Sequence, residues 1–345
     1  MLAHIIVALK RRGIDAVAIP IQKAEKSDTV LGWCPVYADQ KGNWKAKKVK
    51  SPPIYYNRIM GRRREGTEVV QKALERLQKN KKMYFNPRYL SKADIHCHLA
   101  ESMLAKHIPE TIIKPTPQDV IEALKNWPTV YLKPLESCQG RGIFRLEGCR
   151  YGWKAIGIQR MKMKKLYFQQ DHKLLYWLSK LLQRRDYLSQ QGIHLDKWRN
   201  RPYDLRVLVQ KNEQGQWAYV GAGIRLAAPG HVVTHRPNGG QIVKPEKIMV
   251  RKFGYRGWKD KKKELAQLAE EAATTIEREY KSPFGLLTLD VACADCGKLW
   301  ILEINSKPGS FDEGAIQRRS YDLLAAYIRH LQDQRREENE HIYTL

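Results

Sequence analysis

The stretch of sequence that decides the fold is FGLLTLDVACADCGKLWILEINSKPG, residues Phe284–Gly309. Two β-like runs, Phe284–Ala292 and Lys298–Asn305, flank a short turn that contains Asp295, Cys296 and Gly297, which predicts a hairpin. Alternation along each strand predicts an apolar face, which holds Leu287, Leu289 and Val291 in the first strand and Trp300, Leu302 and Ile304 in the second. The opposite face then holds Thr288, Asp290, Ile301, Glu303 and Asn305.

Three oxygen-bearing side chains of this hairpin form a candidate metal site. With an even number of residues in the turn, Asp290, Glu303 and Asn305 all project from one face. Two carboxylates and an amide oxygen suit Mg²⁺, which usually shares its coordination with substrate phosphates. The alternative is a hairpin with one solvated polar face, and the spacing of the residues leaves both open.

Length and composition describe a large protein of the globular class. A chain of 345 residues can bury a large core and divide into two or three lobes, and 43% of its residues are hydrophobic. No apolar run approaches the ~20 residues that span a membrane, and the first residues do not form a secretory signal. We therefore expect a cytoplasmic protein, in which the six scattered cysteines are reduced thiols.

The charge of the chain is strongly positive. Lysine and arginine number 62 against 36 acidic residues, a net charge of +26. Such a charge attracts polyanions, but the basic residues form small dispersed runs and match no nucleic-acid-binding motif. Solvated surface explains most of it. The remainder mildly favours an acidic substrate or an anionic cellular surface, and no specific nucleic-acid binding is expected.

The first ninety residues predict a small α/β lobe. The patterns indicate a helix over Leu2–Arg12, a strand over Asp15–Ile21, a strand over Pro52–Met60 and a helix over Gly66–Asn80. The strand that normally opens such a lobe is missing. Either the chain starts inside its first unit or the fold begins in an unusual way.

The middle of the chain contains a candidate phosphate loop. Its predicted elements are helices over Lys92–Lys106, Pro117–Asn126 and Tyr167–Gln183, strands over Ile108–Pro115 and Thr129–Leu132, and a linker over Asp186–Gly192. The loop is KPLESCQGRGI, Lys133–Ile143, in which glycines permit backbone N–H groups to approach a phosphate. It is neither a Walker A loop nor a Rossmann fingerprint, and an ordinary hairpin turn is the alternative.

The second half of the chain surrounds the hairpin with further strands and helices. Strands are predicted over Asp204–Gln210 and Trp217–Ile224, joined by the turn Asn212–Gly215. Long helices follow over Asp260–Tyr280 and Asp312–His330.

The order of these motifs resembles the ATP-grasp superfamily, in which two α+β lobes hold ATP between them. The resemblance covers roughly residues 90–335 and rests on the loop Lys133–Ile143, on DLRVLV at 204–209 and on the hairpin. More narrowly, PPIYYNRI, FNPRYLSK, IPET and GIHLDKW…PYDLRVLVQ are similar to the YheC/YheD endospore-coat-associated family. The resemblance implies an N-terminal α/β domain at 1–90, like the pre-ATP-grasp domain. It also implies two grasp lobes at 91–188 and 189–335 and a tail at 336–345.

The resemblance also implies roles for individual residues, with ATP and Mg²⁺ as cofactors. Asp290, Glu303 and Asn305 would hold magnesium. Contacts to the nucleotide phosphates are implied for Lys92 and Lys133, and a covering loop for Ser137, Gly140, Arg141 and Gly142. The adenine pocket would be lined by Gln190, Gln191 and Ile193. Arg206 and Arg225 would neutralise the transferring group, with less defined roles for Asn238, Gly239 and Lys307. Related ligases often have an asparagine where this chain has Thr234 and His235, so the contacts there are open.

Three functions follow from the resemblance. The first is an ADP-forming ligase that joins a carboxylate to an amine or thiol through an acyl-phosphate. The second is a kinase-like phosphotransfer, and the third is a structural or binding role in the spore coat. An intact magnesium set argues against the third, since a purely structural protein does not need it. The implied partners are a small-molecule or peptide carboxylate and an amine acceptor, with possible association with the spore coat.

Two cysteine and histidine clusters suggest metal sites of another kind. Cys293 and Cys296 have zinc-knuckle spacing, but no second pair accompanies them, so incidental cysteines are favoured. His96, Cys97 and His98 are adjacent in a predicted helix, where neighbouring side chains diverge.

Overall fold

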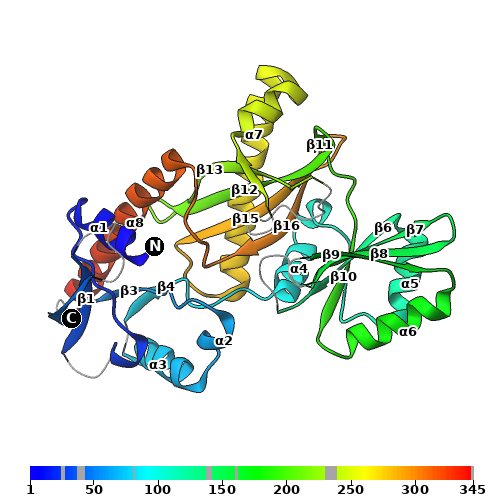
Figure 1. The fold of residues 1–345 in the computed structure, drawn as a ribbon. Coiled ribbons are helices and arrows are strands. Elements are labelled where there is room, and N and C mark those ends of the chain that lie inside the picture. The colour runs from blue at the N-terminus through cyan, green and yellow to red at the C-terminus, as the bar shows by residue number, and fades with distance from the viewer. Residues whose placement is uncertain are drawn as a thin grey trace.

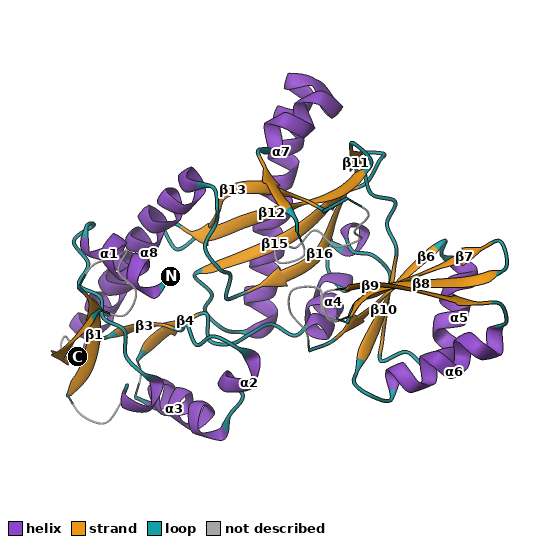
Figure 2. Cartoon of the chain, viewed as in Figure 1, coloured by secondary structure: helices purple, strands orange, loops and turns teal. Residues whose placement is uncertain are grey.

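The computed structural model describes residues 1–24, 28–36, 43–80, 82–136, 142–159, 162–229 and 239–342. An N-terminal lobe, a central second sheet and a first sheet lie side by side, with α4 between the two sheets (Figure 1, Figure 2). The large sheets have six strands each. Within the described part of the chain, no helix has both the length and the apolar character that crossing a membrane requires.

The N-terminal lobe combines short strands with helices. Its elements are α1 (Leu2–Lys10), a 3₁₀ turn (Ile21–Lys23), β1 (Thr29–Pro35), β2 (Trp44–Lys50), β3 (Ile54–Tyr56), α2 (Arg62–Glu65), α3 (Glu68–Lys79) and β4 (Met83–Phe85). The predicted helix over Gly66–Asn80 is confirmed by α3, which buries Val70, Leu74 and Leu77 on one face. The predicted strand over Asp15–Ile21 is wrong. Only Ala18 forms a β-bridge there, and Pro20, which has no N–H group, precedes the 3₁₀ turn.

The first sheet is antiparallel in the order β5-β10-β6-β7-β8-β9. Its strands are β5 (Thr111–Ile113), β6 (Thr129–Pro134), β7 (Phe144–Cys149), β8 (Gly152–Gln159), β9 (Lys162–Phe168) and β10 (Tyr187–Gln191), with helices α5 (Pro117–Asn126) and α6 (Asp171–Leu182). The bounds predicted for α5 are confirmed. A capping box between Thr116 and Asp119, with Pro117 in the first turn, fixes its start.

Two predictions for this sheet are wrong. The predicted linker Asp186–Gly192 contains β10, a strand hydrogen-bonded on both sides. Its polar residues Ser189 and Gln190 are buried, so strand pairing outweighs the loop-like composition. The helix predicted from Tyr167 begins at Asp171, because residues up to Phe168 continue β9 beside β8.

The second sheet carries β14-β13-β12-β15-β16 in that order, with β11 on β12. Its elements are β11 (Lys197–Trp198), β12 (Arg201–Lys211), β13 (Trp217–Leu226), β14 (Gln241–Val243), β15 (Leu286–Cys293) and β16 (Leu299–Asn305). The helices α4 (Lys92–Ala100), with a 3₁₀ turn (Ala105–His107), and α7 (Pro245–Tyr280) pack on this sheet. The prediction had this last helix begin at Asp260, whereas α7 begins fifteen residues earlier, at Pro245. It is interrupted at Gly254, whose φ of 71° is not helical.

The predicted hairpin of β15 and β16 is confirmed, with one correction. A bulge shifts the register, so that Asp290 pairs with Glu303 while Val291 pairs with Ile301. The extra residue, Leu302, reverses the alternation of the strand on the turn side. Ile301 consequently belongs to the apolar core and not to the predicted polar face, whereas Asp290 and Glu303 still share one face.

The N-terminal lobe is fastened to this hairpin by buried polar contacts. The last helix, α8 (Gly314–Ile342), returns to the N-terminal lobe and packs with α1 and Phe85. The fully buried side chain of Asn86, in the left-handed backbone region at φ 55°, donates to the carbonyls of Leu286 at 2.7 Å and Ser306 at 2.5 Å. It accepts from the amide of Gly285 at 2.9 Å. One side chain thereby joins β4 to both strands of the hairpin.

Replacing Asn86 with alanine should destabilise the protein strongly. Asn86→Ala leaves buried backbone groups without partners, each costing about 1–3 kcal/mol, and alanine tolerates the left-handed backbone less well than asparagine. We expect a loss of about 3–5 kcal/mol in the free energy of unfolding, measured by urea denaturation. The matched control is Asn80→Ala, at an exposed position, with an effect within about 0.5 kcal/mol. Equal effects of the two substitutions would contradict this role for Asn86.

Candidate functional site

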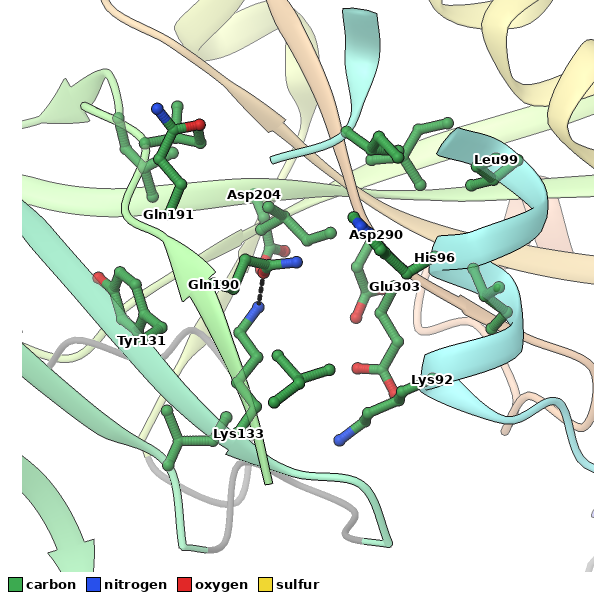
Figure 3. Close-up of a pocket in the computed structure, with 18 of the residues that line it drawn as sticks. Lys92, His96, Leu99, Tyr131, Lys133, Gln190, Gln191, Asp204, Asp290 and Glu303 are labelled. Atoms are coloured by element: carbon green, nitrogen blue, oxygen red, sulfur yellow. Dashed lines mark hydrogen bonds between the residues drawn. The ribbon is translucent and has the colours of Figure 1, made fainter. Parts of the chain in front are cut away.

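A pocket between the two large sheets receives side chains from both of them and from α4 (Figure 3). We call it the interlobe pocket. Lys133 and Tyr131 line it from β6, Lys92 lines it from α4, and Asp290 and Glu303 line it from the hairpin. Residues far apart in the sequence therefore meet in one place, as the resemblance predicted for most of them.

The first-sheet wall of the interlobe pocket follows from the alternation of β6. Val130 and Leu132 are buried in the core, so Tyr131 and Lys133 lie on the opposite face. The ammonium group of Lys133 donates to Oε1 of Gln190 at 2.5 Å, and Nε2 of Gln190 donates to the Thr111 hydroxyl at 2.9 Å. This chain of hydrogen bonds crosses three neighbouring strands and orients the lysine.

Burial changes the protonation of Lys133. Loss of solvent lowers its pKa to about 8, and the nearby charge of Lys92 acts in the same direction. The carboxylates of Glu303 and Asp290 oppose this effect. Lys133 is thus a cation at neutral pH, and the two carboxylates only partly offset the effects of burial and of Lys92 on its pKa. An anionic ligand beside Lys133 would stabilise its charge further.

Helix α4 presents two further polar groups to the interlobe pocket. Lys92 is in its first turn, after the N-cap Ser91, and its ammonium group donates to the carbonyl of Pro134 at 3.1 Å. His96 lies one turn later on the same face and also lines the pocket. Burial lowers the pKa of His96, so its imidazole is neutral at pH 7.

The second-sheet wall is organised by an arginine between two carboxylates. Nε of Arg225 on β13 lies 2.8 Å from Asp204 on β12, and its Nη2 lies 2.7 Å from Asp290 on β15. All three side chains are at least nine-tenths buried. Burial opposes the charge of Arg225, but Asp290 and Asp204 more than compensate and raise the pKa of its guanidinium above the usual value. The guanidinium thereby fixes the positions of both carboxylates.

Other predicted residues lie near the interlobe pocket without lining it. Arg206 is opposite Asp290 in the strand register, with its guanidinium 5.0 Å from the centre of the Phe311 ring. Burial lowers its pKa, against the charge of Asp290. Asn305 pairs with Thr288 and lies two residues after Glu303, on the same face of β16. Gly142 has a φ of 77° and lies against Pro134.

Lys307 occupies a different environment. Its ammonium group is fully buried in an ion pair with Glu65 of α2, whose other oxygen accepts from the amide of Tyr89 at 3.0 Å. Burial lowers the pKa of Lys307 to about 8, with Glu65 opposing the shift. Gln190, Gln191 and Ile193 do line the pocket, whereas Ser137, Gly140, Arg141 and Asn238 lie outside the described residues, as do Thr234 and His235.

Sequence reasoning missed three lining residues for which a signal existed. His96 follows Lys92 by four residues in a helix, Tyr131 precedes Lys133 by two in a strand, and Asp204 precedes Arg206 by two. Helical and strand periods place each of these on the face of a residue already singled out. The apolar wall, formed in part by Leu99, Ile108 and Leu188, carried no local signal because its members come from three separate elements.

The donor set of the interlobe pocket fits a magnesium–nucleotide complex. Asp290 and Glu303 offer carboxylate oxygens, and the two lysines offer charge to phosphates. Within the described ranges, no three histidine, cysteine or acidic side chains gather as a metal site, so a metal here would need ligands from Asn305, phosphates or water. The apolar wall beside these groups suits a flat ring system.

Solved structures share the fold of this chain. The ATP-grasp ligase PsnB complexed with minimal precursor superposes with a TM-score of 0.55 at 12% identity, covering 95% of this chain and 94% of that one. PsnB with a phosphomimetic precursor variant, Mg and ADP gives a TM-score of 0.53 at 12% identity, covering 94% of each chain. The predicted fold, α/β with two ATP-grasp lobes and a smaller N-terminal lobe, is confirmed.

Two curated proteins of Bacillus subtilis (strain 168) are similar in sequence. Endospore coat-associated protein YheD is 24% identical over 78% of this chain, and the match spans 60% of YheD, less than two thirds of its length. Endospore coat-associated protein YheC is 26% identical over 82% of this chain and 77% of its own length.

A family model settles the relationship. The model described as YheC/D like ATP-grasp matches residues 81–331, which include α4, both large sheets and all the lining residues discussed above. Because the match extends over well more than half of the chain, this protein belongs to the YheC/D-like ATP-grasp family.

Proposed function

We propose that the protein is an ATP- and Mg²⁺-dependent ligase that releases ADP and joins a carboxylate to an amine, or to a thiol, through an acyl-phosphate. One observation carries the proposal: two lysines, Lys92 and Lys133, line the same pocket as two carboxylates, Asp290 and Glu303. Cations for phosphates and acidic ligands for magnesium are the groups that a phosphoryl transfer needs side by side.

The residues divide the work by charge. Lys92 and Lys133 hold the nucleotide phosphates, and Asp290, Glu303 and Asn305 hold Mg²⁺, which when bound neutralises phosphate charge. Arg206 and Arg225 neutralise charge on the transferring phosphoryl group. The phosphates are covered by a loop that contains Ser137, Gly140, Arg141 and Gly142. Adenine is flanked by Gln190, Gln191 and Ile193. The proposal also counts Asn238 and Lys307 among the catalytic residues, without a defined step for either.

The proposed reaction needs positioning and charge neutralisation more than a protein nucleophile. A carboxylate oxygen of the substrate takes the γ-phosphoryl group of ATP, which releases ADP. The resulting mixed anhydride is a good electrophile, and an amine attacks its carbonyl carbon and displaces phosphate. Preorganised cations lower the barrier because they are already oriented toward the charge that is transferred.

The setting and partners of the reaction follow from the relatives' names. YheC and YheD are named as endospore coat-associated, and two of the PsnB structures contain a precursor. We therefore place the proposed activity in spore-forming cells, with a small or peptide carboxylate as acyl donor and association with the coat. A coat-binding role without catalysis is the second candidate, favoured by those names.

Glu303 provides the first test. Isothermal titration calorimetry with ATP and Mg²⁺ should show binding, and Glu303→Gln should weaken it by at least about tenfold because one metal ligand loses its charge. Glu303 is preferred to Asp290, whose loss would also release Arg225. Glu101→Gln, at the exposed end of α4, is the matched control. If the folded wild type does not bind ATP at millimolar concentration, the ligase proposal is wrong and the coat-binding role is favoured. Binding followed by transfer of the γ-phosphoryl group to a hydroxyl acceptor, with release of ADP, would identify a kinase.

Lys133 provides a test through pH. A bound polyanion favours the ammonium form, so affinity is full below the pKa of about 8 and falls as the pH rises above it. Between pH 7.5 and 9 we expect the affinity for ATP to drop by about tenfold.

The control for the pH test is Lys133→Arg. Arginine keeps its proton over this range, so the variant should lose most of the pH dependence. The variant retains Lys307, whose pKa is also about 8. An unchanged pH profile would therefore assign the effect to Lys307 or to another group.

A further inference from the structure

A second cavity lies where the N-terminal lobe meets the second sheet. Its walls come from α1, from the chain after β3, from the sheet strands β12 and β15, and from α8 with the segment before it (Figure 1). It is distinct from the interlobe pocket, since none of the described residues lines both. We call it the Arg58 cavity after the one charged side chain among the described residues that line it.

Arg58 is a buried cation with an unused donor. Only 9% of the residue is exposed. Its Nη2 donates to the carbonyl of Pro308 at 2.7 Å and to the sulfur of Met1 at 3.0 Å, and its Nη1 donates to the Tyr56 hydroxyl at 3.2 Å. Its Nε is buried without a hydrogen-bond partner, and no carboxylate of the described residues forms an ion pair with it. A buried charge without a counter-ion is costly, which points to an anionic ligand.

The rest of the lining limits what that anion can be. Ile5, Leu208, Leu286 and Leu324 contribute aliphatic surface and Tyr321 contributes a phenol. Uncharged polar side chains also line the cavity, namely Gln210, Ser310, Gln317 and Ser320. The cavity measures about 40 Å³, enough for about three water molecules or one carboxylate group. A cavity of this size, with one guanidinium among its described lining residues, suits one carboxylate group better than a phosphate, which carries more charge and more oxygens.

The Arg58 cavity and the interlobe pocket are both lined by residues from one face of the second sheet. On β12, Asp204 lines the pocket and Leu208 lines the cavity, with Arg206 between them on that face. On β15, Asp290 lines the pocket and Leu286 lines the cavity, again four residues apart. Four residues of strand span about 13 Å, the length of an extended chain of about ten bonds. Phe311 lines the cavity, and its ring centre lies 5.0 Å from the guanidinium of Arg206.

We propose that the Arg58 cavity binds a second, non-reacting carboxylate of the acid substrate, whose reacting carboxyl group lies near Arg206, about 7–13 Å away along the strands. The acid substrate is then an extended dicarboxylate, such as a peptide or aliphatic diacid. This assignment rests on the proposed function for the reacting end, whereas the cavity and its charge do not depend on ATP.

The test compares two ligands that differ in one charge. Suberate carries carboxylates at both ends of an eight-carbon chain, and its monomethyl ester keeps the length but only one charge. By calorimetry in the absence of nucleotide, the wild type should bind suberate at least about tenfold more tightly than the ester. Inorganic phosphate is titrated as a third ligand, and binding of phosphate in preference to suberate would overturn the assignment to a carboxylate.

Variants of Arg58 connect the difference to the cavity. Arg58→Met should abolish the preference for suberate and, because it removes an uncompensated buried charge, should leave the melting temperature unchanged or higher. Arg58→Lys should keep part of the preference. The matched control, Arg63→Met on the exposed side of α2, should keep all of it.

The outcomes separate this inference from the proposed ligase. Equal binding of suberate and its ester by the wild type overturns the inference even if every variant fails to fold. So does an Arg58→Met protein that keeps the preference and melts at a lower temperature, which would make Arg58 purely structural. Binding of ATP should be unaffected by Arg58→Met. Loss of suberate preference without any ATP binding would support the cavity and contradict the ligase.

Discussion

The site depends on one buried arginine held between two aspartates from different strands. Arg225 on β13 pairs with Asp204 on β12 and with Asp290 on β15, so it joins three neighbouring strands through side chains as well as through the backbone ladder. Removing one partner of such a buried group generally costs about 3–5 kcal/mol, because the other charges stay behind without compensation. The same contact holds the carboxylate of Asp290 in place, which a candidate metal ligand requires. Stability and site geometry are therefore secured by the same atoms.

The N-terminal lobe contributes to the site from outside. Asn86 bonds to β15 and to the residue after β16, while Glu65 binds Lys307 two residues beyond Asn305. The open end of the hairpin, away from its turn, is thus held by a lobe whose described residues contribute no lining to the interlobe pocket. Lys307, which the resemblance placed among catalytic residues, is oriented by this contact toward Glu65, and its position explains how a change in the N-terminal lobe would reach the hairpin.

Local patterns predicted what local physics determines. Thr116, Pro117 and Asp119 specify a helix start within four residues, and alternation specified the apolar face of β15. The bulge at Leu302 was not predictable, because it is set by pairing between β15 and β16. β10 was missed because its strand character comes from two neighbours distant in the sequence. The order of the motifs was enough to predict the carboxylates and lysines of the site. The residues of the apolar wall could be identified only from the tertiary fold.

Helix α4 has a consequence for how the two lobes move. Its apolar residues Ile95 and Leu99 belong to the core of the second sheet, so Lys92 moves with that sheet, whereas Lys133 moves with the first. The charge of Lys92 lowers the pKa of Lys133, which means that the two ammonium groups repel each other across the interface. Separation of the lobes relieves this repulsion, and a polyanion between the lysines converts it into attraction. Occupancy of the interlobe pocket by a polyanion therefore shifts the electrostatic balance between the lobes toward the closed arrangement.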